Sequence, residues 1–128
     1  MTMTILQDYN MRRLFRRLAV IVVTAWANYT YNTAVAQADA RYRREHTMIY
    51  VASKNFQPDY LTTYDKNRFK AEKHVFGYAA RLLTLQTLKN GCYYHTPDKA
   101  GNQGMSEKDK ELRRQFFIRE RLQKAKLI

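Results

Sequence analysis

Residues 18–38 read LAVIVVTAWANYTYNTAVAQA, a run of 21 positions without a charged side chain. The run stands out because 27% of the chain is charged. Four arginines come directly before it: Arg12, Arg13, Arg16 and Arg17. As an α-helix the run is about 32 Å long, enough to cross a hydrocarbon core of about 30 Å. The sequence therefore predicts a basic N-terminal segment, 1–17, followed by a transmembrane helix over 18–38.

Polar residues within the run indicate what this helix packs against. Thr24, Asn28 and Asn32 recur every four residues, so they share one side of a helix. Such a stripe is costly against lipid but is tolerated against protein, where amides and hydroxyls find hydrogen-bond partners. Ala34 and Ala38 add a spacing of small residues that lets two backbones approach closely. We therefore expect these five residues to form a helix-packing interface.

The N-terminal pattern has three other interpretations. A basic segment, a short apolar core and small residues near 34–38 are also typical of a secretory signal. The arginine-rich first 17 residues are typical of a mitochondrial presequence. A buried core helix of a soluble protein is the third interpretation, because a short apolar run alone does not separate it from a membrane span. We expect the segment to be retained in the folded chain.

Helix breakers are rare in this sequence. The 128 residues include four glycines and two prolines, and none of these lies within residues 1–57. This absence favours one long helix that starts near Met11 and continues past the membrane to about residue 54. Cys92 is the single cysteine, so an intramolecular disulfide is excluded.

The remainder of the chain predicts two more helices. A linker over 55–64 is broken by Pro58, and Asp65 is a plausible N-cap for the helix that follows. Three segments complete the chain: a helix over 65–90 that stops at Gly91, a loop over 91–105, and a charged helix over 106–128 that Ser106 begins with a capping-box-like Ser-Glu-Lys-Asp. The predicted fold class is all-α, extended rather than compact.

Apolar residues on the second and third helices predict surfaces for protein neighbours. A highly charged helix with a narrow apolar stripe needs a partner to bury that stripe. The expected protein-docking face consists of Phe69, Phe76, Leu83, Leu112, Phe116 and Leu122.

A net charge of +12 indicates an acidic partner. The four arginines before the run are placed to contact anionic lipid headgroups. Nucleic acid is the alternative, because basic and aromatic residues alternate within 41–44, 64–70 and 113–117. The sequence contains no RNP-type strand, GXXG loop or zinc-finger spacing, which are the modules that commonly accompany such patterns.

Candidate catalytic chemistry is sparse. Cys92 and His95 have the spacing of half a zinc site, with His46 and His74 as distant candidates for the other half. The same pair lacks the third, orienting group and the glycine-rich loop that a cysteine nucleophile normally uses. We predict no enzyme, no catalytic residue, no cofactor, no metal site and no small-molecule substrate.

The layout of the whole chain is similar to that of small accessory subunits of mitochondrial respiratory complexes: a short basic N-terminus, one imperfect span and a basic helical extension. The resemblance implies a single-pass protein of the mitochondrial inner membrane that clamps neighbouring protein subunits and contacts anionic phospholipid such as cardiolipin. It rests on layout alone, and the paired cysteines of the twin CX9C type found in some such subunits are missing. An ATP synthase accessory subunit and a basic RNA-binding or mitoribosomal protein remain alternatives.

Overall fold

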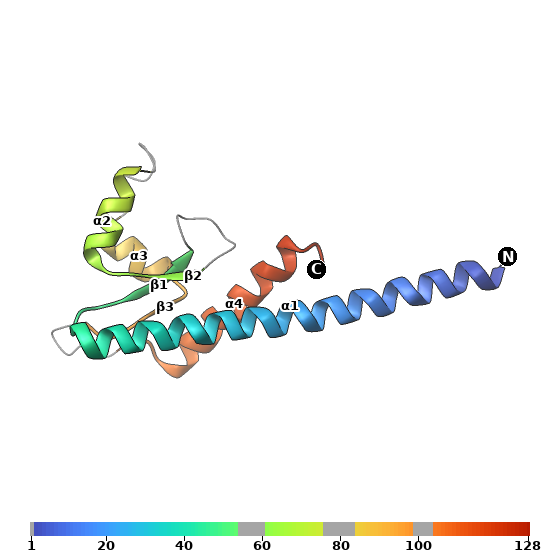
Figure 1. Cartoon of the computed structure of the whole chain (residues 1–128), viewed down its shortest axis with the longest axis horizontal. Helices are drawn as coiled ribbons and strands as arrows, with labels where there is room; N and C mark the ends of the chain where they lie inside the picture. The colour runs from blue at the N-terminus through green and yellow to red at the C-terminus, as the bar shows by residue number, and fades with distance from the viewer. Residues whose placement is uncertain (1, 54–60, 76–83, 99–103) are drawn as a thin grey trace.

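One long helix dominates the molecule. The structure is a computed structural model and describes residues 2–53, 61–75, 84–98 and 104–128. Helix α1 (Thr2–Glu45) is about 66 Å long, and a small body lies along its C-terminal half while its N-terminal half projects beyond that body (Figure 1). The other described elements follow in order: β1 (Tyr50–Ser53), β2 (Leu61–Tyr64), α2 (Lys66–Val75), α3 (Leu85–Gly91), β3 (Tyr94–His95) and α4 (Glu107–Lys124).

The prediction of a long N-terminal helix is confirmed, but its end is nearer to the N-terminus than expected. Helix α1 stops at Glu45 and not near residue 54. His46 adopts a left-handed conformation with φ 53°, and its amide donates to the carbonyl oxygen of Tyr42 over 2.8 Å. A residue in this conformation ends a helix, and histidine adopts it more readily than most non-glycine residues.

The predicted transmembrane segment lies inside α1. Among the residues that the structure describes, no helix is both long and apolar enough to cross a membrane. The C-terminal part of the segment is covered by the chain itself, because Ala27, Tyr31 and Ala38 have no exposed surface. Their side of α1 packs against α4 and the sheet.

A three-stranded antiparallel sheet corrects the all-α prediction. Its order is β2-β1-β3, with Tyr50 opposite both Tyr64 and His95. The sheet takes residues from the predicted end of the first helix, from the 55–64 linker and from the 91–105 loop. Val51 and the preceding Ile49 are fully buried against Ala34 and Ala38 of α1.

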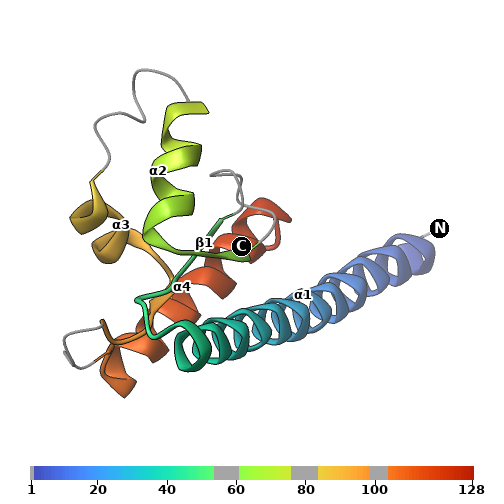
Figure 2. The ribbon, with the colours of Figure 1, turned by 60° about the vertical axis from the view of Figure 1, so that its left-hand side comes forward.

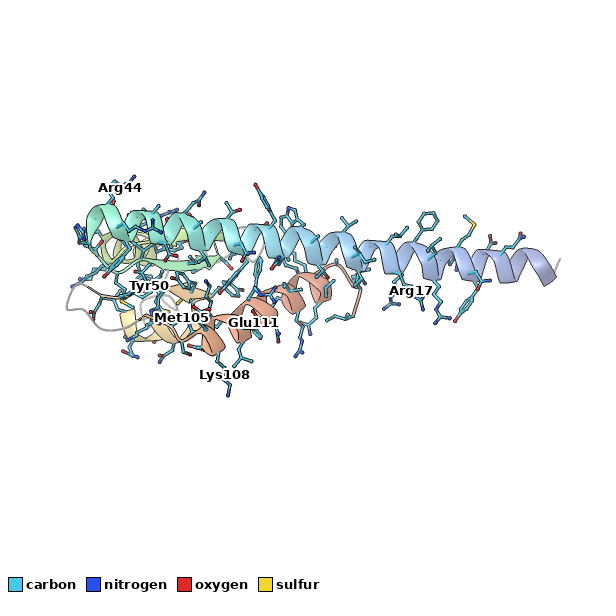
Figure 3. The ribbon with its side chains drawn as sticks, turned by 90° about the horizontal axis from the view of Figure 1, so that it is seen from below. Arg17, Arg44, Tyr50, Met105, Lys108 and Glu111 are labelled. Atoms are coloured by element: carbon cyan, nitrogen blue, oxygen red, sulfur yellow. The ribbon has the colours of Figure 1, made fainter. Side chains whose placement is uncertain are left out.

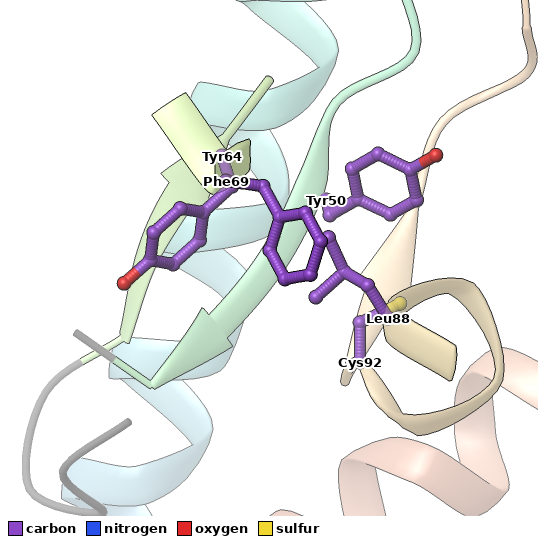
Figure 4. Close-up of a cluster of buried hydrophobic side chains, with 5 residues drawn as sticks. All are labelled: Tyr50, Tyr64, Phe69, Leu88 and Cys92. Carbon is purple, nitrogen blue, oxygen red and sulfur yellow. The ribbon is translucent and has the colours of Figure 1, made fainter. Parts of the chain in front are cut away.

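The opposite face of the sheet carries a second core. Side chains alternate along a strand, so Tyr50 points away from α1 while Val51 points towards it. The cluster on this face combines residues from two strands, from α2 and α3, and from the end of α3: Tyr50, Tyr64, Phe69, Leu88 and Cys92 (Figure 4). The body is therefore layered, with α1 on one side of the sheet and α2 and α3 on the other (Figures 1 and 2).

The helix predicted over 65–90 is not continuous. Asp65 caps α2 as predicted, since its Oδ1 accepts from the amide of Arg68 over 2.7 Å. Thr84 is extended, with φ −110° and ψ 168°, and its side chain caps a separate helix, α3. Helix α3 includes Gly91 as its last residue, so it ends one residue later than the predicted end at residue 90. Residues 76–83 lie outside the described part of the chain.

Helix α4 lies alongside α1. It begins as predicted after Ser106, whose hydroxyl accepts from the amide of Asp109 over 3.1 Å. Phe117 of α4 is almost fully buried between Tyr31 of α1 and Tyr93, with ring centroids 6.2 Å and 5.2 Å away. The surface that buries the apolar side of the C-terminal helix is therefore α1 of the same chain.

Candidate interaction surfaces

The most conspicuous feature of the surface is a row of large apolar side chains on the side of α1 that faces away from the body. These side chains are between 46% and 71% exposed. We call them the uncovered α1 face: Met11, Leu14, Phe15, Leu18, Ile21, Val22, Trp26 and Tyr29. At 3.6 residues per turn they fall within one arc of roughly 140°. Figure 3 shows the body and α4 on one side of α1 and the other long side open.

The uncovered α1 face lies opposite the face that packs. Tyr29 and Tyr31 are two positions apart and therefore point in nearly opposite directions. Tyr29 is 71% exposed, whereas Tyr31 is fully buried. The Tyr31 hydroxyl donates to the carbonyl oxygen of Tyr93 over 2.8 Å, and burial raises the pKa of this tyrosine well above its usual value. Helix α1 therefore has two apolar faces, and the chain covers one of them.

The arginines predicted to contact lipid flank the uncovered α1 face. Arg12 and Arg17 lie roughly 110° to either side of the centre of the apolar arc. Arg13 and Arg16 point further round, towards the side that carries α4, and Arg16 Nη2 donates to the carbonyl oxygen of Leu127 over 3.2 Å. All four side chains are exposed. The structure thus places a basic border beside an apolar surface.

The predicted helix-packing interface faces the chain's own body. Ala34 and Ala38 are buried against Ile49 and Val51. The Oδ1 atom of Asn28 accepts from Arg114 Nη1 of α4 over 2.7 Å. Thr24 is half-buried and Asn32 is exposed. The prediction was a contact with other helices, whereas Asn28, Ala34 and Ala38 contact residues of the same chain.

The residues of the predicted protein-docking face do not form one surface. Phe69 is buried in the core beneath the sheet, whereas Leu112 and Phe116 are 56% and 58% exposed. Leu122 is half-buried. Phe76 and Leu83 lie outside the described residues. Among the described members of this set, Leu112 and Phe116 are the two that are largely open to solvent.

Leu112 and Phe116 border a groove between α3 and α4. This α3–α4 groove has a volume of about 240 Å³, and its walls include Cys92, Tyr93 and Arg113. The guanidinium of Arg113 is fixed, since Nη1 donates to the carbonyl oxygen of Cys92 over 2.8 Å and to that of Lys89 over 3.1 Å. Sequence periodicity did not indicate this groove, because it joins residues that are about 20 positions apart.

In the segments that suggested nucleic-acid binding, several aromatic side chains are buried and several basic side chains form ion pairs within the chain. Tyr64 is buried beneath the guanidinium of Arg68, whose carbon lies 4.7 Å from the ring centroid, and Phe117 is buried against α1. Arg41 pairs with Asp65 over 2.9 Å, and Arg68 pairs with Glu72 over 3.0 Å. These aromatic rings are not presented to stack with bases.

Cys92 and His95 lie in an environment that favours their neutral forms. Burial raises the pKa of the Cys92 thiol to about 11, against a smaller opposing effect of Arg113. Burial also lowers the pKa of His95. Cys92 Sγ donates to the carbonyl oxygen of Lys89 over 3.4 Å, and His95 Nδ1 lies 3.1 Å from that of Thr96. Within the described ranges, no three His, Cys, Asp or Glu side chains are grouped closely enough to hold a metal ion.

Two surfaces were therefore missed or only partly identified by sequence reasoning. A signal for the uncovered α1 face was present, since Met11, Phe15, Leu18, Val22 and Tyr29 follow a helical spacing. This spacing begins at Met11, before the uncharged run, and therefore crosses the boundary of the predicted transmembrane segment. Comparisons with protein-family models, with curated proteins and with solved structures found no match to this chain.

Proposed function

We propose that the protein is a non-catalytic structural subunit of a large membrane-associated assembly, with a respiratory-chain complex of the mitochondrial inner membrane as the expected setting. The observation that carries the proposal is the uncovered α1 face. Its eight side chains are each between 46% and 71% exposed and lie in one arc of a single helix, an unusually large apolar surface for a soluble monomer to leave open.

The α3–α4 groove supports the same role from a second direction. Leu112 and Phe116 point away from α1, because the opposite side of α4 holds Phe117 against it. The described residues therefore present apolar side chains on two different sides of the molecule. This arrangement suits a subunit that joins two neighbours, one along α1 and one protein subunit at the α3–α4 groove.

The charges and thiol of the body are consistent with a structural role. The ion pair between Arg41 of α1 and Asp65, at the start of α2, joins two elements of the body. Burial raises the pKa of the Cys92 thiol further above neutral pH, so the group is a poor nucleophile there. Both features stabilise the fold.

The test is the native size of the full chain in mild detergent extracts of its source membranes. We expect it to migrate with a complex far larger than its own 15.3 kDa. Changing Leu112→Ser together with Phe116→Ser is expected to release the subunit from that complex. Lys66→Ser with Lys70→Ser is the control, since both side chains are exposed on α2 and neither lines the α3–α4 groove.

Two outcomes would contradict the proposal or one of its parts. A wild-type chain that migrates alone would exclude a role as a structural subunit. A double serine variant that remains fully incorporated would exclude the α3–α4 groove as the protein contact.

A further inference from the structure

We propose that the uncovered α1 face lies flat in the surface of an anionic phospholipid bilayer, with the helix axis parallel to the membrane plane. The inference rests on the proposed function, because it names the partner of the α1 surface. It replaces a helix that crosses the membrane by one that lies along it. In this arrangement the arginines beside the uncovered α1 face bind the phosphate groups of the lipid headgroups. The apolar side chains of that face insert among the acyl chains.

The first support is the arrangement of charge around the N-terminal half of α1. An interfacial helix has an apolar face bordered by basic residues whose long stems reach up to the headgroups. Arg12 and Arg17 occupy the two borders, as their angles to the apolar arc show. Between Asp8 and Asp39 the sequence contains no acidic residue. This surface therefore favours a partner that carries negative charge.

The second support is the order of side chains along the open side of α1. Met11 to Val22 form its aliphatic and phenyl-bearing part, and Trp26 and Tyr29 follow on the same arc. Trp and Tyr concentrate at the boundary between headgroups and acyl chains. Further along, Arg43 and Arg44 are exposed on this side. Figure 3 shows Arg44 on the open side of α1 and Arg17 towards the side of α4.

The third support is steric. The body and α4 pack on the side of α1 opposite the uncovered face, so α1 is free to lie on a flat surface along its length (Figure 3). Lys108 lies on the far side of α4, away from that surface. The α3–α4 groove is lined by no residue of α1, so a helix α1 that lies on the bilayer leaves it available to a protein neighbour.

The chain contains its own probe for this contact. Trp26 is the single tryptophan, and it lies on the uncovered α1 face. Its fluorescence therefore reports whether this face leaves water. We would titrate the full-length protein with vesicles of phosphatidylcholine mixed with phosphatidylglycerol, and with vesicles of phosphatidylcholine alone. A shift of the emission to shorter wavelength with the anionic vesicles, together with flotation of the protein, is expected.

Two pairs of variants test the apolar and the basic parts separately. Phe15→Ser with Val22→Ser is expected to abolish the shift, while Leu112→Ser with Phe116→Ser keeps it. Arg12→Gln with Arg17→Gln should weaken binding about 30-fold, at the usual contribution of a basic residue near an anionic surface. Lys108→Gln with Arg119→Gln removes the same charge from α4 and should leave binding nearly unchanged. Helix content by circular dichroism verifies that each variant folds.

The failure of this inference is distinguishable from failure of the proposed function. If the protein binds neither kind of vesicle but still migrates in a large native complex, the proposed lipid contact is wrong and the proposed role as a subunit stands. Self-association that Phe15→Ser with Val22→Ser abolishes, without vesicle binding, would show that a second copy covers this face and would also overturn the lipid partner. A chain that binds vesicles but migrates alone in native extracts overturns the subunit role instead.

Discussion

The hydroxyl of Tyr31 donates a hydrogen bond to the backbone carbonyl oxygen of Tyr93 over 2.8 Å. The contact links the middle of α1 to the residue that precedes β3, across 62 positions of sequence. Phe117 of α4 packs against both tyrosine rings. The three residues therefore join the long helix, the sheet and the C-terminal helix at one point.

Removing this hydroxyl should destabilise the fold measurably. Tyr31→Phe keeps the ring in place but leaves the Tyr93 carbonyl oxygen without this donor in a site that is largely buried. We expect the free energy of unfolding to fall by about 1–3 kcal/mol, the usual cost of an unsatisfied buried group. Urea denaturation followed by circular dichroism measures it. Tyr29→Phe is the control, and an equal loss in both variants would contradict the role of this hydrogen bond.

Phe117 and Phe116 form a matched pair for testing how α4 packs. Phe117 is 1% exposed and Phe116 is 58% exposed, although they are adjacent in sequence. Phe117→Ala should lower the free energy of unfolding by about 3–5 kcal/mol, because it removes a ring from the core between α1 and α4. Phe116→Ala should change it by less than about 0.5 kcal/mol. Comparable effects in thermal or urea unfolding would mean that α4 does not pack on α1 in this orientation.

Local sequence signals predicted some elements well. A stretch of 57 residues without glycine or proline corresponds to the long helix, and Asp65 and Ser106 cap helices as expected. The sheet was missed because β1 and β3 are four and two residues long and pair across more than 40 positions. Periodicity in a short window does not contain such a pairing. The end of α1 was missed because His46, not glycine, takes the left-handed conformation.

The predicted interface shows a different limit. Ala34 and Ala38 are buried, but they pack against residues of the sheet and not against a second helix. Periodicity identifies which side of a helix is suited to packing, whereas the partner depends on tertiary contacts. The same limit applies to Leu112 and Phe116, which share a helix stripe with buried neighbours yet remain exposed.

Asp65 has two separable roles, which predict different effects for two substitutions. Its Oδ1 caps α2 through the amide of Arg68, and its Oδ2 pairs with Arg41 Nη2 of α1 over 2.9 Å. Asp65→Asn retains an oxygen for the cap and should reduce the free energy of unfolding by less than about 1 kcal/mol, since the ion pair is partly exposed. Asp65→Ala loses both contacts and should cost about 1–3 kcal/mol. Urea midpoints distinguish them, and equal losses would show that the cap contributes nothing.

Burial of Cys92 predicts how stability depends on alkaline pH. The pKa of its thiol rises from its ordinary value of 9.0 to about 11 in the folded chain, chiefly because the group is buried. The folded state therefore holds this proton more tightly than the unfolded state. The resulting stabilisation is fully present below about pH 9 and declines as pH rises towards about 11, with a total of about 2–3 kcal/mol. Burial also raises the pKa of Tyr93, to about 12, and so contributes in the same direction at higher pH.

A comparison with Cys92→Ala separates the thiol from the tyrosines. The variant is expected to be less stable at neutral pH because of the cavity it creates, but it retains the tyrosine contribution. Between about pH 8 and about pH 10, wild type should therefore lose about 1 kcal/mol more than Cys92→Ala, and urea unfolding at both pH values measures the difference. Parallel losses in the two proteins would mean that the thiol ionises as easily in the folded chain as in the unfolded one. The cluster of Tyr50, Phe69, Leu88 and Cys92 would then be open to water, and α3 would not close over the sheet.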